Sequence, residues 1–97
     1  MFQLDENKAA VLAKAIAEAW DELPGNDETE LGPLNEAKAE TAMKNALEKP
    51  EAKDAGIKLD EEQAADLLGQ FKVYLDSAED WGDASRMEEE LASLFAA

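Results

Sequence analysis

Residues 59–81, with the sequence LDEEQAADLLGQFKVYLDSAEDW, carry apolar side chains at the spacing of an amphipathic helix. At about 100° per residue, positions three and four apart lie on the same side of a helix, so these side chains occupy about a third of its circumference. The stripe consists of Ala64, Leu67, Leu68, Phe71, Tyr74, Leu75 and Ala78. A chain organised around such a helix is expected to bury this stripe against other helices.

The opposite side of the same helix is acidic. Carboxylates three or four positions apart on a helix lie about 5–6 Å from each other at Cβ. The acidic residues of this side are Glu62, Asp66, Asp76 and Asp80, with Glu61 and Glu79 close by. Gly69 and Val73 lie in the middle of the face. If Val73 is exposed, it supplies an apolar contact at the centre of an interface. If Val73 is buried, it packs against a neighbouring turn or the C-terminal helix. The sequence does not decide between these two environments.

The rest of the chain predicts three further helices. Asp5 is a typical N-cap for the first, and Leu4 is placed to pack on its first turns. Pro33 is favourable in the first turn of the second helix, while Pro50 ends that helix and opens a short turn that Gly56 closes in the left-handed conformation. These predicted helices cover residues 5–22, residues 33–48 and a segment that starts at Asp83 or Ser85, and residues 24–30 are predicted to form a loop.

Each of these three helices has an apolar face. The first presents Leu12, Ile16, Trp20 and Leu23; the second presents Ala39, Ala42, Met43, Ala46 and Leu47; the last presents Ala84, Met87, Leu91, Leu94 and Phe95. Asp60 and Gln63 resemble a capping box that fixes the start of the helix in residues 59–81, and Trp81, Gly82 and Asp83 are expected to end it. We therefore predict an all-α fold, a compact single-domain bundle of about four helices with a short extra turn near residues 50–56.

Charge limits the possible partners. The 97 residues include 24 Asp and Glu against 9 Lys and Arg, which gives a net charge of −15. Such a charge repels nucleic acid and anionic membranes, so neither is expected as a direct partner, and it attracts basic surfaces. The sequence has no apolar run long enough to span a membrane and no recognisable signal peptide, so we expect a cytoplasmic location.

The sequence offers little for catalysis or metal binding. It contains no Cys and no His, which excludes thiol nucleophiles, zinc thiolate sites and the commonest general base. With Gly82 as the sixth position of an EF-hand loop, Glu88 falls at the twelfth, but Ser77 and Trp81 occupy the first and fifth positions, where carboxylates or amides are needed. We therefore expect no enzymatic activity, no cofactor and no resident metal ion.

The distribution of carboxylates is the remaining signal. Rows of acids on neighbouring helices can reproduce the spacing and sign of a nucleic-acid backbone. Between Asp76 and Glu90, Arg86 is the only opposing charge. The predicted binding surface consists of Glu62, Asp66, Val73, Asp76, Glu79, Asp80, Asp83, Glu88, Glu89 and Glu90. The loop acids Asp27, Glu28 and Glu30 are candidates to extend it.

In size, charge and lack of catalytic residues, the chain resembles phage-encoded DNA-mimic proteins, including anti-CRISPR and anti-restriction inhibitors. The resemblance lies in composition and covers no motif. It implies an inhibitor that binds the basic surface of a nucleic-acid-handling protein or complex in the cytoplasm of a bacterial host. The alternative is a helical adaptor or assembly protein in which Trp20, Trp81, Val73 and the alanine-rich second helix form an oligomer contact, and acidity serves solubility. Rising salt should weaken the first kind of binding and spare the second.

Overall fold

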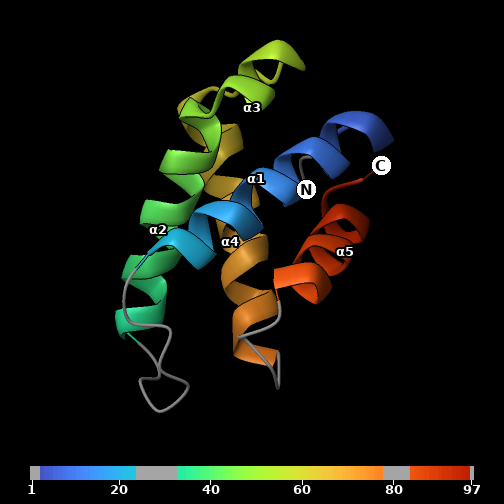
Figure 1. Ribbon diagram of the computed structural model, residues 1–97. Coiled ribbons are helices and arrows are strands. Elements are labelled where there is room, and N and C mark those ends of the chain that lie inside the picture. Colours follow the sequence, from blue (N-terminus) through green and yellow to red (C-terminus); the bar gives the residue numbers. More distant parts are fainter. Residues whose placement is uncertain (1–2, 24–32, 78–83, 97) are drawn as a thin grey trace.

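The computed structural model describes residues 3–23, 33–77 and 84–96. In these ranges the chain forms four helices of 12 to 17 residues and a short helix of 5 residues (Figure 1). The helices are α1 (Glu6–Glu22), α2 (Pro33–Glu48), α3 (Pro50–Asp54), α4 (Glu61–Ser77) and α5 (Ala84–Phe95). The predicted all-α bundle and its short element near residues 50–56 are confirmed. The predicted loop over residues 24–30 and the predicted helix end at residues 81–83 lie outside the described ranges.

Side-chain caps define the starts of α1 and α4, as the sequence predicts. The Asp5 carboxylate accepts a hydrogen bond from the backbone N–H of Lys8 at 2.8 Å. At α4, the backbone N–H of Gln63 donates to the Asp60 carboxylate at 2.8 Å, and the backbone N–H of Asp60 donates to the Gln63 side chain at 3.2 Å. These bonds satisfy backbone donors that have no partner within the helix.

The short helix α3 ends in the left-handed turn that Gly56 was predicted to make. Gly56 has φ 76°, a conformation in which a side chain is strained. Its N–H donates to the carbonyl of Lys53 at 3.0 Å, and the N–H of Ile57 donates to the carbonyl of Ala52 at 3.2 Å. This pair of bonds is a Schellman motif, and it brings the buried Ile57 side chain back to the core.

Among the described helices, α1 packs most extensively against its neighbours, and α4 does so much less. Helix α1 packs against α2, α3 and α5, whereas α4 packs against α2 and α5. The buried residues of α1 are Ala9, Leu12, Ala13, Ala15, Ile16, Ala17, Ala19 and Trp20. Most of them are alanines, which allow neighbouring helices to approach closely but give a weak hydrophobic pattern in the sequence. The interpretation that placed residues 59–81 at the centre therefore missed the role of α1.

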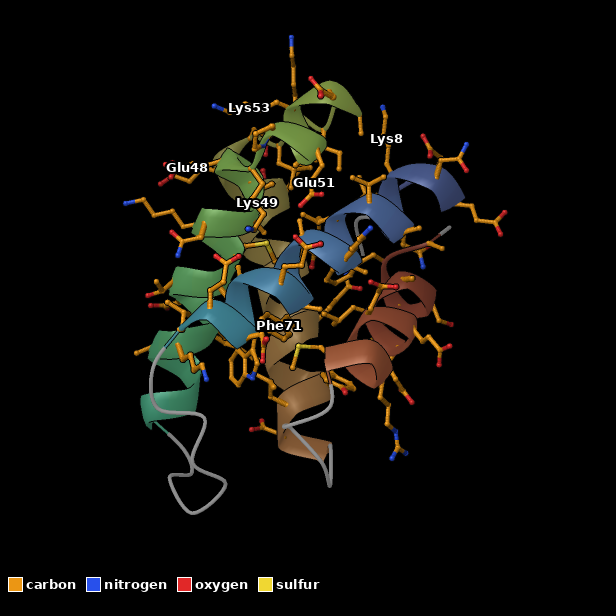
Figure 2. All side chains as sticks on the ribbon, viewed as in Figure 1. Lys8, Glu48, Lys49, Glu51, Lys53 and Phe71 are labelled. Atoms are coloured by element: carbon orange, nitrogen blue, oxygen red, sulfur yellow. The ribbon has the colours of Figure 1, made fainter. Side chains whose placement is uncertain are left out.

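Aromatic side chains join α1 to α4 across the core. The Trp20 and Phe71 rings meet edge to face, with centroids 5.7 Å apart and an angle of 71° between the ring planes. Phe71 lies in the interior of the bundle (Figure 2). From α2, the Lys38 ammonium lies 4.2 Å from the centroid of the Trp20 ring, a cation–π contact. Trp20 is only 3% exposed, so it is not available for the oligomer contact considered from the sequence.

The two ends of the described chain are hydrogen-bonded to each other. The N–H of Leu4 donates to the carbonyl of Phe95 at 2.7 Å, and the Gln3 side chain donates to the carbonyl of Ala96 at 2.9 Å. Leu4 is buried in the core, and Figure 1 shows the N-terminal segment beside the end of α5. The sequence predicted the packing of Leu4 but not its pairing with the last residues of the chain.

Candidate functional site

The outer face of α4 carries the first half of the predicted binding surface. Glu62, Gly69 and Asp76 are exposed, and Asp66 is half-buried. Val73 is 69% exposed, so its side chain lies largely in solvent rather than in the interior. Glu79, Asp80 and Asp83 belong to the predicted surface but lie outside the described residues, as do the loop acids Asp27, Glu28 and Glu30.

A groove of about 400 Å³ runs beside this face, between α4 and α5. It is lined by Ala65, Asp66, Gly69, Gln70 and Val73 of α4 and by Leu94 of α5. A Cβ added to Gly69 would meet no atom within 4 Å, so the glycine leaves open space on the α4 side of the groove. The groove therefore combines an apolar lining with one carboxylate, from Asp66.

Leu94 was predicted to be a core residue, and that prediction is wrong. Met87, Leu91 and Phe95 follow one another at intervals of four and are fully buried, whereas Leu94 is 40% exposed. At about 100° per residue, Leu94 lies about 60° from Leu91 around the helix axis, on the flank that faces α4. In the sequence, the apolar residues at positions 87, 91 and 95 already form a series with a spacing of four. Leu94 does not belong to this series, which could have indicated that it lies outside the core.

The three consecutive acids of α5 do not form one surface. Glu90 lies one helical turn before Leu94, on the side of the α4/α5 groove. The half-buried Glu88 lies one turn before Ala92, which faces α1, and Glu89 is exposed between them. Only Glu90 is therefore placed to act together with the acids of α4.

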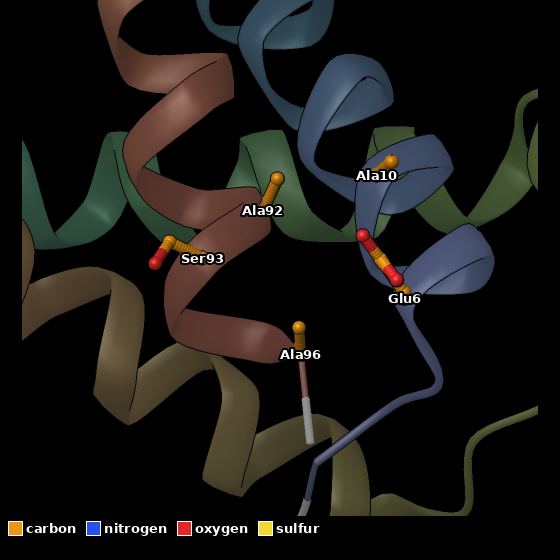
Figure 3. A pocket seen from close by; sticks show the side chains of 5 residues that line it. All are labelled: Glu6, Ala10, Ala92, Ser93 and Ala96. Atoms are coloured by element: carbon orange, nitrogen blue, oxygen red, sulfur yellow. The ribbon is translucent and has the colours of Figure 1, made fainter.

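A second groove lies between α1 and α5 and has a volume of about 620 Å³. Figure 3 shows Ala92 and Ala96 of α5 projecting toward α1, with Glu6 and Ala10 on the opposite side. Ser93 completes the lining. One carboxylate and one hydroxyl are the functional groups that this groove offers, among otherwise small apolar side chains.

Ion pairs concentrate on the side of the bundle formed by α1 and α2. The pairs in the described ranges join Lys8 to Asp5, Lys49 to Glu18 and Glu22, and Lys72 to Glu40. Lys72 belongs to α4, about one helical turn before Asp76, and its ammonium lies 3.2 Å from Glu40 of α2. Among the described residues, Glu62, Asp76, Glu89 and Glu90 make no ion pair. Among the described residues, Glu62, Asp76 and Glu90 near the α4/α5 groove therefore lack the ion pairs that Glu18, Glu22 and Glu40 make.

The junction of α1 with α2 and α3 holds a cluster of coupled charges. Figure 2 shows Lys49 and Glu51 reaching toward α1, where the Lys49 ammonium lies 3.0 Å from Glu22. The hydrogen bond with Glu22 raises the pKa of Lys49. Partial burial raises the pKa of Glu18, and a hydrogen bond and repulsion from Glu51 add to the rise, while Lys49 opposes it. These charges connect α1 with the junction of α2 and α3 and do not belong to the acidic face of α4.

Within residues 3–23, 33–77 and 84–96, no helix has the length and apolar character needed to cross a membrane. The same ranges contain no cluster of three or more side chains placed to hold a metal ion. Comparisons of the chain with protein-family models, with curated proteins and with solved structures find no match. The function is therefore inferred from the geometry and the charge of the molecule itself.

Proposed function

We propose that this chain is a small acidic interaction protein that binds the basic surface of a nucleic-acid-handling protein and excludes nucleic acid from it. The observation that carries the proposal is the uneven distribution of counter-charge. The lysines of the ion pairs neutralise Asp5, Glu18, Glu22 and Glu40 in or beside α1 and α2, whereas Glu62 and Asp76 on α4 and Glu90 on α5 make no ion pair in the described part of the chain. A net charge of −15 strengthens the field of this surface.

The length of the α4 row suits an extended basic groove. Glu62 and Asp76 are fourteen positions apart, which corresponds to about 21 Å along a helix that rises 1.5 Å per residue. One strand of a duplex advances about 3.4 Å per nucleotide, so the row covers the axial length of about six nucleotides. Glu90 adds a carboxylate on the neighbouring helix. A protein surface that binds phosphates of one strand could therefore meet carboxylates near both ends of α4, with Gly69 and Val73 between them.

The resemblance in composition to anti-CRISPR and anti-restriction inhibitors supports the same class of target. Such a target carries lysines and arginines that normally contact phosphates. Attraction between oppositely charged surfaces accelerates association and weakens as salt rises, since the Debye length falls to about 10 Å at 0.1 M. A carboxylate surface of this kind thus requires no motif beyond its charges and their spacing.

An adaptor that binds through an apolar surface is the second candidate. The exposure of Val73 and Leu94, at 69% and 40%, favours it, because both side chains border one groove. The version considered from the sequence also used Trp20, Trp81 and the alanine-rich α2. Trp20 and the α2 residues Ala39, Ala42 and Ala46 are buried in the bundle, and Trp81 lies outside the described residues. Among the described residues, the exposed large apolar side chains are Val73 and Leu94, so the apolar contact that the structure supports lies at the α4/α5 groove.

A pull-down from a nuclease-treated bacterial lysate tests the proposal. The bait is the tagged chain, and the test variant carries Glu62→Gln, Asp66→Asn and Asp76→Asn. A matched control carries Asp21→Asn, Glu48→Gln and Asp54→Asn, which removes the same charge from exposed positions on other helices. Bound proteins are compared after washing at low and at high salt.

The proposal predicts that the wild-type chain and the control variant recover a nucleic-acid-binding protein, and that the test variant and the high-salt wash lose it. Equal loss in both variants would show that net charge alone attracts the partner, without a role for the α4 face. A partner that all three baits retain at high salt would favour the adaptor.

A further inference from the structure

The α4/α5 groove has an apolar lining and an acidic surround. Val73 and Leu94 border it with exposed apolar surface, and Gly69 leaves its floor open. Asp66 lies in the lining itself. Three further acids stand about one helical turn from lining residues: Glu62 before Asp66, Asp76 after Val73, and Glu90 before Leu94. Carboxylates thus stand on several sides of one apolar depression.

We infer that this groove receives a single large apolar side chain from a partner segment that carries Lys or Arg on both sides of it. The inference rests on the proposed function and adds the contact that fixes the position of the partner. Apolar side chains that enter a pocket, surrounded by charges that set orientation, are typical of the centre of protein interfaces.

The open shape of the groove favours a side chain of a larger partner over an enclosed small molecule. A volume of about 400 Å³ is at the low end for ligand pockets, which generally enclose most of their ligand. This depression is bounded by the side chains of two helices and is open to solvent along the α4 face, where Gly69 and Val73 are exposed. A side chain that projects from a larger partner can fill it, because the partner itself covers the open side.

Charge complementarity identifies the chemistry of the occupant. A second copy of this chain would bring another net charge of −15 against the same acidic rim. An anionic segment is disfavoured for the same reason. A basic segment instead pairs its cations with Asp66, Asp76 and Glu90, while its apolar side chain covers Val73 and Leu94.

NMR titration of the isotope-labelled chain with synthetic peptides tests this inference. The probe is a helical peptide of about 16 residues made of Lys and Ala with one central Leu, long enough to populate helix in water. The control peptide has Ala in place of that Leu and carries the same charge. The signals to follow are the Gly69 amide and the methyl groups of Val73 and Leu94. Burial of the Leu side chain should strengthen binding about 10-fold over the control peptide.

Two substitutions at Gly69 separate the groove from the fold. Gly69→Met extends a flexible apolar side chain into the groove, and Gly69→Ala adds only a methyl group. Neither Cβ meets an atom within 4 Å, and Gly69 does not have the positive φ found at Gly56, so both variants should retain α4. We expect Gly69→Met to remove the advantage of the Leu peptide and Gly69→Ala to preserve most of it.

The outcomes distinguish the inference from the proposed function. Selective shifts at Gly69, Val73 and Leu94 with the Leu peptide, lost in Gly69→Met, would support the inference. Equal binding of both peptides, unaffected by Gly69→Met, would overturn it and leave a charge-only role for the acidic face intact. Absence of binding by either peptide at low salt would overturn it as well. Concentration-dependent shifts of the same signals without peptide would assign the groove to a second copy and also overturn it.

Discussion

Val73 of α4 and Leu94 of α5 line the same groove, although each belongs to a helix whose other large apolar side chains are mostly buried. Val73 is 69% exposed and Leu94 is 40% exposed. Single exposed apolar residues are common in proteins, but two that share one groove form a patch that can bind a partner. Because acids surround this patch, the apolar and the electrostatic features of the surface coincide.

Val73 should contribute little to the stability of the isolated chain. We expect Val73→Gln to change the free energy of unfolding by no more than about 0.5 kcal/mol, because the side chain is largely in solvent. Leu67→Ala, at a fully buried position of the same helix, should cost about 2–5 kcal/mol. Urea denaturation of both variants measures the contrast, and a loss at Val73 comparable to that at Leu67 would show that Val73 supports the fold.

The two described glycines should respond in opposite ways to alanine. Gly69 lies inside α4 with open space around it, so Gly69→Ala should stabilise the chain by about 0.5–1 kcal/mol. Gly56 also has open space but a φ of 76°, so Gly56→Ala should destabilise it by about 1–2 kcal/mol. Thermal unfolding of the two variants checks the difference in sign. Destabilisation by Gly69→Ala would argue against a regular helix at that position.

Moderate salt should stabilise the folded chain. A net charge of −15 on a body with a radius of gyration of 12.2 Å produces repulsion that dissolved ions screen. The melting temperature should therefore rise from low to moderate salt, and the variant with Glu62→Gln, Asp66→Asn and Asp76→Asn should show a smaller rise. A melting temperature that falls over this interval would contradict clustered repulsion on the folded surface.

Glu18 should make stability depend on pH in a predictable direction. Partial burial, with a hydrogen bond and repulsion from Glu51, raises the pKa of Glu18 above its ordinary value of 4.5. Between the ordinary pKa of Glu18 and its raised pKa in the folded chain, the folded chain binds more protons than the unfolded chain. The stability of the fold therefore decreases as pH rises through this interval. The contribution of protonated Glu18 is fully present below pH 4.5.

Glu18→Gln isolates this effect, since glutamine can still donate a hydrogen bond to Glu51 but does not titrate. As pH is lowered from neutral toward 4.5, the wild-type chain should gain stability relative to this variant. Urea midpoints measured across the interval give the difference. Parallel pH profiles for the two proteins would show that the Glu18 carboxyl does not couple to folding.

Local sequence signals were sufficient to predict the helical segments, the caps of α1 and α4 and the turn that ends α3. The Asp5 cap, the pair of Asp60 and Gln63, and the left-handed turn at Gly56 each depend on residues within one turn of each other. Local geometry of this kind is determined by neighbouring residues, so it can be read before the tertiary structure is known.

Features that depend on contacts between distant segments were not predicted. The central position of α1 depends on how its alanines meet three other helices, and the bonds of Leu4 and Gln3 join opposite ends of the chain. The groove is lined by both Val73 and Leu94. The sequence left the environment of Val73 open, whereas Leu94 was expected in the core and is exposed. Periodicity places a residue on a face of its helix, but it does not show where the neighbouring helix stops covering that face.

Displacement of nucleic acid from the captured partner tests the central claim most directly. A labelled duplex is bound to the purified partner, the acidic chain is added, and the released duplex is measured by fluorescence anisotropy. The account predicts release by the wild-type chain and by the variant with Asp21→Asn, Glu48→Gln and Asp54→Asn, and little release by the variant with Glu62→Gln, Asp66→Asn and Asp76→Asn. A ternary complex, in which partner, duplex and acidic chain remain bound together, would contradict it.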